Sequence, residues 1–571
     1  MARDPVAPER AELAALLGSF LSYYDISGER GDEAKLAERL SQFSRDSCVS
    51  TAACLTALIA EGRFLSQPDL QLSLCKQVFS PEILQRIEER LRERGATDRI
   101  VFFGQQLLTL MEAAVRHCTG DGRPIRTSED LSEWGQCCLM ASEVWEPSPE
   151  IAPEEAPNYL AAMVLRQLNF LNTFAMKYQI ARCYRLFVEL PHITRAAYDF
   201  DAAFRRTARI GIEAYIALLF GIYARASRCV RSGIGEDTCF AETEFRPVTK
   251  IGTDEYASTF AQMTQTLDEL KDDIGSARGV GEDHHFFALR TKPLLRLDSG
   301  RLVCAHPQFL AHKMSDGIYW AMADGLRGDE KGFHAFSNAF GKLFEEEVRD
   351  VLNHYLPCSS KPDAPVEPPE YGTRRRRKQA SDAIVMSGDS VVFIEAKTSR
   401  LKLEVYAHGD IETFVDDMKE RSVLKAAQQL ATVIRDFQDG RFEVAGRDYN
   451  SFTRIFPVVV TLTPIIQHPF LARLRAIKRA YRRMRFPPKV RSRPYVHVLD
   501  IDELETLVAS QVALPDVLES WYNDRAMKHF CVANFILHDR LPAKDMPRLD
   551  ATWARIDKEV LARYFAVQDG A

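Results

Sequence analysis

Residues 381–397, SDAIVMSGDSVVFIEAK, constrain the fold more tightly than any other stretch of this chain. Two apolar runs lie on either side of 387-SGDS-390, where Gly388 can adopt the backbone conformation of a tight turn. The segment therefore predicts two strands joined as a hairpin. Side chains alternate along a strand, so one face of the second strand would hold Val391, Phe393, Glu395 and Lys397, and the other would hold Val392, Ile394 and Ala396.

Three charged side chains stand among the apolar residues of this hairpin. Asp382 begins the first strand, so its carboxylate can approach Glu395 across the pair. Glu395 and Lys397 share a face and are separated by roughly 6–7 Å of strand rise. Two carboxylates that converge at the end of a buried sheet repel each other unless a cation lies between them, and such oxygen ligands favour Mg²⁺ or Mn²⁺. The alternative for an E-x-K at a strand end is a solvated salt bridge.

The hairpin lies in a part of the chain where strands and helices alternate, whereas the first part has helical patterns. Up to about Cys239, apolar residues at helical spacing predict helices at 83–95, 105–118 and 159–187. After about Gly279 the sequence predicts a hairpin at 293–306, helices at 333–356, 419–438 and 469–484, strands at 455–464 and 494–500, and a helical tail from Ile501. Residues 357–379 are rich in proline and are expected to form an exposed loop.

These patterns predict a multidomain α and α/β protein. We expect a helical N-terminal subdomain at residues 1–150, a second helical subdomain at 151–280, an α/β domain at 281–505 and a helical C-terminal extension at 506–571. The first boundary rests on the proline- and acid-rich break 146-EPSPEIAPEEAPN-158. The α/β domain should contain a mixed sheet flanked by helices.

The chain of 571 residues has an ordinary soluble composition, with 46% hydrophobic and 27% charged residues. No secretory signal is expected, because the first residues mix acids and bases. The apolar run 214–224 is too short to span a membrane and fits a buried helix better. We therefore expect a cytoplasmic protein without a membrane partner. Its twelve cysteines contain no C-x-x-C spacing, which argues against a structural zinc site.

Positive charge is concentrated in two segments, although the net charge of the whole chain is -6. Between Phe470 and Arg493 there are ten basic residues and no acid, so -6 minus +10 leaves the rest of the chain at -16. The second segment is 374-RRRRK-378, which a localisation signal or a solvated loop would also explain. Clustered basic residues favour contact with nucleic-acid phosphates. The candidate contacts are Arg374, Arg375, Arg376, Arg377, Lys378, Arg475, Arg479, Arg482 and Arg483.

The hairpin and its surroundings resemble the PD-(D/E)xK nuclease superfamily. Asp382 fits the aspartate of its motif, and 395-EAK-397 fits the E-x-K. Upstream, 341-GKLFEEEV-348 is similar to the first-helix pattern, in which a glycine is followed four residues later by a metal-supporting glutamate, here Glu345. Downstream, 425-KAAQQL-430 resembles the lysine and glutamine that some members direct towards the site. The resemblance covers roughly residues 293–500, and Ser381 stands where the pattern has proline.

The resemblance implies a restriction endonuclease-like α/β domain and residue roles within it. Asp382, Glu395, the Ala396 carbonyl and Glu345 would hold Mg²⁺ or Mn²⁺, and Lys397 would orient the attacking water or balance charge in the transition state. Gln429 is a further candidate catalytic residue, and Lys425 a further nucleic-acid contact. Glu346 and Glu347 are alternatives to Glu345, and Gln428 is an alternative to Gln429.

The function implied is a metal-dependent endonuclease that hydrolyses phosphodiester bonds of DNA, in a prokaryotic defence or restriction-type system. The helical N-terminal region would regulate the enzyme, select its substrate, or bind a partner subunit or a second copy of the chain. One alternative is a non-catalytic nucleic-acid-binding or scaffold protein that retains the nuclease fold. Another is an RNA-directed nuclease.

Overall fold

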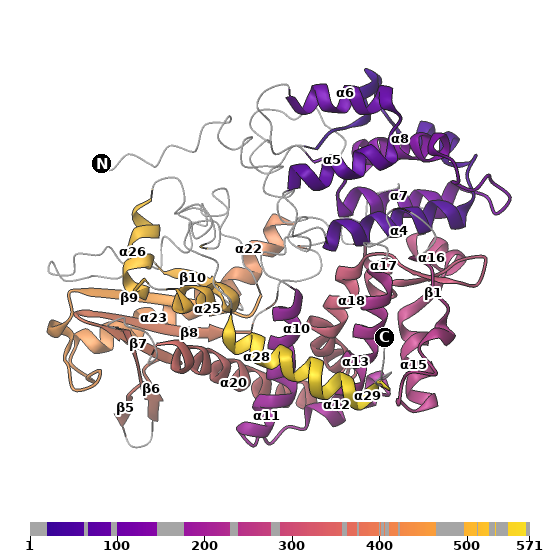
Figure 1. Ribbon diagram of the computed structural model, residues 1–571. Coiled ribbons are helices and arrows are strands. Elements are labelled where there is room, and N and C mark those ends of the chain that lie inside the picture. Colours follow the sequence, from indigo (N-terminus) through magenta and orange to yellow (C-terminus); the bar gives the residue numbers. More distant parts are fainter. Residues whose placement is uncertain are drawn as a thin grey trace. The chain divides into compact units, whose positions relative to one another are not determined.

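The computed structural model describes residues 20–61, 67–92, 100–145, 176–228, 234, 238–275, 286–356, 363–373, 376–398, 400, 405, 410–420, 423–463, 496–510, 512–524, 532 and 546–566 (Figure 1). Contacts group the chain into two compact units, and each unit is assembled from separate stretches of sequence. The first comprises Met1–Ile151, Asp201–Gly325 and Arg555–Ala571, and the second comprises Ala152–Phe200 and Leu326–Ala554. Residues 281–325 thus belong to the first unit and not to the unit that contains the later strands.

The first unit is mainly helical, as the sequence predicts for its N-terminal part. Its elements are α2 (Tyr23–Ser27), α3 (Glu33–Leu40), α4 (Arg45–Glu61), α5 (Gln67–Val78), α6 (Pro81–Arg92), α7 (Gly104–His117), α8 (Ser128–Trp145), α12 (Phe200–Ala208, beginning at the last residue of the other unit), α13 (Ile212–Ala226), η5 (Glu242–Glu244), α15 (Thr253–Met263), β1 (Thr264–Thr266), α16 (Leu267–Ile274), α17 (Phe287–Thr291), β2 (Leu294–Arg296), β3 (Leu302–Cys304), α18 (Pro307–Met314), α19 (Asp316–Asp324), η8 (Ile556–Leu561) and α29 (Ala562–Tyr564).

A small sheet in this unit confirms the hairpin predicted at 293–306. β2 pairs antiparallel with β3, and β1 pairs parallel with β2. Gly300 has a φ of 81° in the connecting turn, a conformation that glycine adopts without steric cost.

The apolar run 214–224 lies in α13, and most of that helix is buried, as expected. Within the residues that the structure describes, no single helix has the length and hydropathy needed to cross a bilayer. The bent pair α12 and α13 passes that test on length and composition only.

The second unit carries the hairpin that the sequence singles out. Its elements are α10 (Met176–Tyr184), η3 (Arg185–Glu189), α11 (Leu190–Ile193), α20 (Glu330–Tyr355), β4 (Asp363–Val366), β5 (Glu370–Thr373), β6 (Arg376–Gln379), β7 (Ala383–Ser387), β8 (Ser390–Lys397), α22 (Ile411–Glu420), α23 (Val423–Gln438), η6 (Tyr449–Ser451), β9 (Arg454–Thr461), β10 (His497–Asp500), α25 (Ile501–Ala509), α26 (Leu514–Asn523) and α28 (Pro547–Arg555).

A five-stranded mixed sheet forms the centre of this unit, in the order β10-β9-β8-β7-β4. β8, β9 and β10 are parallel, whereas β7 is antiparallel to both of its neighbours. Ser387 pairs with Ser390, so Gly388 and Asp389 form the two-residue turn between β7 and β8. Gly388 has a φ of 60°, which confirms the turn expected from the sequence.

Helices cover both faces of the sheet (Figure 1). Val391 and Phe393 pack towards α23, while Val392, Ile394 and Ala396 pack towards α20 and α25, as the predicted alternation requires. On α20 the predicted apolar stripe is buried and consists of Phe336, Phe340, Phe344, Val348 and Leu352. These findings confirm the multidomain α and α/β class, with a mixed sheet between helices.

The prediction of an exposed loop at 357–379 is wrong for the part described, where β4, β5 and β6 lie. β4 pairs with β7 at the edge of the main sheet, and β5 pairs with β6 in a separate two-stranded ribbon. Pro365 is compatible with β4 because an edge strand can lack one ladder donor. The helix expected at 419–438 is confirmed by α23, and α22 precedes it in the chain. The helix expected at 469–484 lies outside the described residues.

Candidate active site

The end of the β7–β8 hairpin opposite its turn brings Asp382 beside the last residues of β8. Ala383 and Ile394 form the final strand pair, and the Asp382 amide then donates to the Ile394 carbonyl at 3.0 Å. The Asp382 carboxylate accepts a hydrogen bond at Oδ2 from the Ala396 amide at 2.7 Å. These two bonds extend the pairing of the strands and hold the carboxylate against the Glu395–Lys397 end of β8.

Glu395 and Lys397 lie on the same face of β8 and form an ion pair. The Lys397 ammonium donates to Glu395 Oε2 at 3.0 Å, and the side chains are 22% and 8% exposed for lysine and glutamate. Burial raises the pKa of Glu395 to about 7; the charge of Asp382 adds to the rise and Lys397 opposes it. The ammonium of Lys397 therefore does not offset the combined effect of burial and of the Asp382 charge on Glu395.

Glu345 approaches the same end of the sheet from α20. Burial, followed by the charge of Asp382, raises the pKa of Glu345, whereas the charges of Arg349 and Lys397 oppose the rise. The structure thus brings together four of the residues expected from the sequence, and their charges act on one another.

The geometry does not form a ready-made cage for a metal ion. Among the described side chains, no group of three or more His, Cys, Asp and Glu is arranged to hold a cation. Magnesium sites commonly use one or two carboxylates and complete the coordination shell with water and substrate oxygens. Asp382 and Glu395 with the Ala396 carbonyl form a donor set of that type, with Glu345 nearby.

Arg349 is a charged residue of this site that the sequence reasoning missed. Its Nε donates to the Asp382 backbone carbonyl at 2.8 Å, and its Nη1 pairs with Glu346 at 2.7 Å. The signal available in the sequence was the spacing: Arg349 follows Glu345 by four residues, so the two lie on the same face of a helix.

The structure does not bring Gln429 to these residues. Lys425, Gln428 and Gln429 are exposed on α23, whose buried face carries Ala426 and Leu430. Among the described contacts, none joins Gln429 to the carboxylates of the site. Helix propensity with solvent exposure therefore accounts for both glutamines here.

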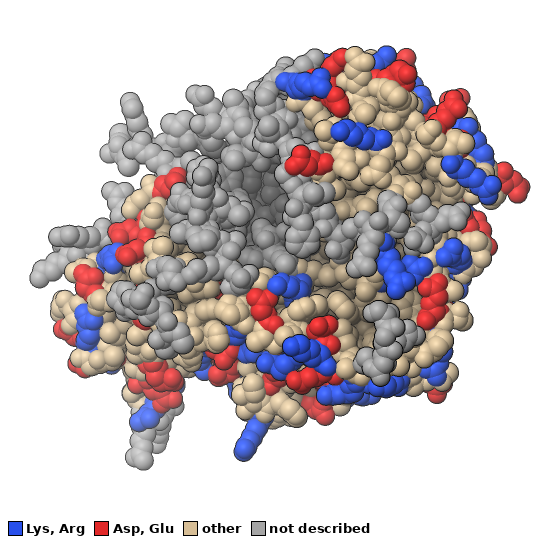
Figure 2. Space-filling model, viewed as in Figure 1, with Lys and Arg blue, Asp and Glu red and all other residues tan. Residues whose placement is uncertain are grey.

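Most of the basic residues expected to contact nucleic acid lie outside the described residues. These are Arg374, Arg375, Arg475, Arg479, Arg482 and Arg483, and the same holds for the side chain of Arg376. Arg377 and Lys378 are on β6. Lys378 pairs with Asp436 at 2.8 Å and Arg377 with Glu370 at 3.5 Å, so neither charge is isolated. On the face drawn in Figure 2, acidic and basic side chains of the described residues are interspersed.

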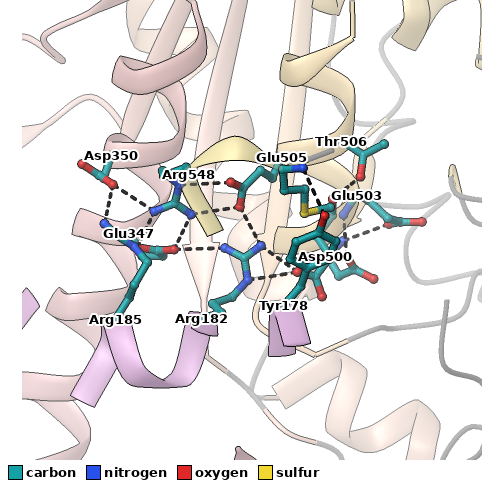
Figure 3. A network of polar contacts seen from close by, with 12 residues as sticks. Tyr178, Arg182, Arg185, Glu347, Asp350, Asp500, Glu503, Glu505, Thr506 and Arg548 are labelled. Atoms are coloured by element: carbon teal, nitrogen blue, oxygen red, sulfur yellow. Dashed lines mark hydrogen bonds and ion pairs between the residues drawn. The ribbon is translucent and has the colours of Figure 1, made fainter. Parts of the chain in front are cut away.

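A buried network of charges next to α20 was also missed. Three arginines meet Glu347 in the second unit, as Figure 3 shows. Arg182 Nη1 donates to Glu347 at 3.0 Å and Arg548 Nη2 donates to it at 2.6 Å, while Arg185 Nε approaches at 3.3 Å. Burial opposes ionisation, but Arg548 and the other two arginines hold the pKa of Glu347 below its usual value. Glu347 therefore has a structural role and is not the glutamate that faces the strand ends.

Glu505 on α25 completes this network. Arg182 Nη2 donates to Glu505 at 2.7 Å, Arg548 Nε donates to it at 3.0 Å, and the Tyr355 hydroxyl donates at 2.9 Å. Burial opposes ionisation of this carboxyl as well, yet the two arginines lower the pKa of Glu505 to about 2. The network thus joins α10, η3, α25 and α28 to α20, the helix that positions Glu345.

Comparisons with protein-family models, with curated proteins and with solved structures found no match for this chain.

Proposed function

We propose that this chain is a metal-dependent endonuclease that hydrolyses phosphodiester bonds, with DNA as its substrate. The observation that carries the proposal is the meeting of Asp382, Glu395 and Lys397 at one end of a buried hairpin, where Asp382 is bonded to the Ala396 amide at 2.7 Å. A buried carboxyl group beside a second, half-buried one destabilises a fold when both ionise. Such a pair is better suited to binding a cation than to supporting the sheet.

The residues present fit a divalent cation. Burial raises the pKa of Glu395 and the charge of Asp382 adds to the rise, so its ionised form is disfavoured, and a bound cation would stabilise that form. Asp382, Glu395, the Ala396 carbonyl and Glu345 would hold Mg²⁺ or Mn²⁺. When bound, the metal would lower the pKa of a coordinated water and stabilise charge on the leaving oxygen.

The side chains around the cation would orient the reactants. An ammonium has three donors, and Glu395 accepts one of them from Lys397 at 3.0 Å. A second donor would orient the attacking water or bond a phosphate oxygen as charge develops in the transition state. Glu345 would contact the cation directly or through a water.

A restriction endonuclease-like fold is part of the same proposal. The chain order of α20, β7, β8 and α23 agrees with the order of helix, aspartate strand, E-x-K strand and second helix that the resemblance implies. In the sheet, β7 and β8 are neighbours in a mixed arrangement with helices on both faces. These features support the proposed fold together with the site residues.

The substrate and the setting rest on the sequence. The basic segments at 374–378 and 470–493 favour phosphate contacts, and Lys425 is exposed on α23 as such a contact requires. A cytoplasmic role in prokaryotic defence or restriction follows from the resemblance alone. The helical N-terminal region would then regulate cleavage, select the substrate or bind a partner.

A second candidate is a non-catalytic nucleic-acid-binding or scaffold protein with the same fold. The observation that favours it is the arrangement of the described acids, which form no three-ligand metal site. Binding of DNA that is unaffected by Mg²⁺ or Mn²⁺, with no cleavage, would support this candidate.

Cleavage of supercoiled plasmid and linear DNA with Mg²⁺ or Mn²⁺ tests the proposal. The wild-type chain is compared with Asp382→Ala and Lys397→Ala, and Asp389→Ala in the turn at the far end of the same hairpin serves as the matched control. We expect metal-dependent cleavage that both site variants lose and the control retains, with unchanged circular dichroism for all four proteins.

If the wild-type chain cleaves no DNA, titration with Mn²⁺ decides between a latent enzyme and a non-catalytic protein. Binding that Asp382→Ala abolishes indicates a latent enzyme that awaits an activator. Absence of binding rejects the catalytic proposal and leaves the non-catalytic one. Competition between labelled DNA and RNA then distinguishes the two substrate classes.

A further inference from the structure

Arg349 lies between α20 and the first strand of the candidate site. It follows Glu345 by one helical turn and is 24% exposed. Nε donates to the Asp382 carbonyl at 2.8 Å, while Nη1 of the same guanidinium pairs with Glu346 Oε1 at 2.7 Å. The planar group is therefore held at two points, one on its own helix and one on the strand end.

Hydrogen bonds to Ile394, Ala396 and Arg349 fix the position of Asp382. Its amide donates to the Ile394 carbonyl at 3.0 Å and its carboxylate accepts from the Ala396 amide at 2.7 Å, so both of these bonds join it to β8. The bond from Arg349 to its carbonyl is different, because it joins Asp382 to the helix that carries Glu345.

We infer that Arg349 is a positioning residue that sets where the Asp382 carboxylate lies relative to Glu345. This inference rests on the proposed function, because the quantity that Arg349 adjusts is the affinity of the two carboxylates for a divalent cation. Residues that orient metal ligands through a hydrogen bond change metal affinity by roughly 10- to 100-fold when they are substituted. Lysine would keep the charge near Glu345 but lose the planar fork that reaches both partners.

The experiment measures Mn²⁺ binding to the full chain by isothermal titration calorimetry. It compares wild type with Arg349→Met, which removes the charge, and Arg349→Lys, which keeps it. Arg454→Lys is the matched control: Arg454 is 23% exposed, starts β9, and bonds Ser390 at 2.8 Å and Asp516 at 2.8 Å at the opposite end of the sheet. We expect both Arg349 variants to bind Mn²⁺ about 10-fold or more weakly and the control to bind as wild type does.

A second readout does not depend on metal. Hydrogen exchange of the metal-free proteins, followed in a peptide that contains Ala396, reports on the bond from this amide to the Asp382 carboxylate. Exchange there should be faster in both Arg349 variants and unchanged in Arg454→Lys, with similar exchange elsewhere in the sheet.

The possible results distinguish the positioning role of Arg349 from the proposed metal-dependent function. Unchanged Mn²⁺ affinity in both Arg349 variants, or full recovery of affinity by lysine, overturns the positioning role. If the wild-type chain binds no Mn²⁺, the proposed function fails, and hydrogen exchange alone decides about Arg349. Faster exchange at Ala396 then supports the positioning of Asp382, and unchanged exchange rejects it.

Discussion

Glu345 and Glu347 are two residues apart on α20 but have different surroundings. Glu345 is influenced by Asp382 and Lys397 at the strand ends, and its pKa is raised first by burial and then by Asp382. Glu347 is fully buried and accepts hydrogen bonds from Arg182 and Arg548. Because positions two residues apart on a helix lie on different faces, one helix supplies both a candidate site residue and the centre of a structural ion network.

Glu347→Gln should destabilise the second unit strongly. Removal of one charge from a buried ion network leaves its partners uncompensated, at a cost of about 3–5 kcal/mol. Urea unfolding followed by circular dichroism and tryptophan fluorescence measures this change. Glu346→Gln is the matched control, since its side chain is 42% exposed and its surface pair with Arg349 should contribute less than about 1 kcal/mol. Equal effects of the two substitutions would contradict the structural role of Glu347.

Glu345→Gln should separate activity from stability. Since burial and Asp382 both disfavour its ionised form, the neutral amide should leave the free energy of unfolding of the metal-free protein unchanged within about 1 kcal/mol, or raise it slightly. Metal-dependent cleavage should be lost or fall by at least about 10-fold, as expected for a group that supports the cation. Parallel urea unfolding and plasmid assays provide the two measurements. Loss of stability comparable to that of Glu347→Gln would show that Glu345 is structural.

The β7–β8 hairpin and the buried face of α20 could be predicted from the sequence because local periodicity determines both. Alternation with a period of two places Phe393 and Ile394 on opposite faces of the sheet, and a spacing of three to four residues places Phe340 and Phe344 on one side of the helix. The placement of Glu395 beside Lys397 follows from the same alternation. The local sequence pattern was therefore sufficient to predict most residues of the candidate site.

Other features depend on partners that are far away in the sequence. Arg182 and Glu347 are separated by 165 positions, so no local pattern indicates that they bond. The edge strand β4 was hidden by Pro365 and by the other prolines of residues 357–379, because its pairing with β7 depends on the sheet and not on its own composition. The same limit applies to Arg349, whose spacing from Glu345 was visible but whose bond to Asp382 was not.

Gly388→Ala tests the turn that joins the two site strands. Gly388 has a φ of 60°, and an added Cβ would meet no atom within 4 Å, so the cost is backbone strain without a clash. We expect a loss of about 1–2 kcal/mol in the free energy of unfolding. Gly388→Asn should lose less, because asparagine tolerates this conformation better. Urea unfolding of the two variants measures the difference, and an alanine variant as stable as wild type would contradict the strained turn.

Glu395→Gln should change the pH dependence of stability in the metal-free protein. The pKa of Glu395 in the folded state is raised to about 7, so the folded protein binds this proton more tightly than the unfolded chain does. The stability that the bound proton supplies is fully present below the unfolded value of about 4.5 and is lost as the pH rises through 7. Glutamine does not titrate and avoids this loss.

The stability of Glu395→Gln relative to wild type should therefore increase between pH 5 and pH 8, by on the order of 2 kcal/mol. Urea unfolding with a chelator present at each pH measures the difference, and comparison across pH cancels the constant effect of removing the partner of Lys397. Asp389→Asn is a suitable control, because the pKa of Asp389 is lowered, mainly by its bond to Thr453, and its contribution is already complete above pH 5. A difference that stays constant from pH 5 to pH 8 would show that Glu395 is ionised throughout, and the rise in its pKa would then be absent.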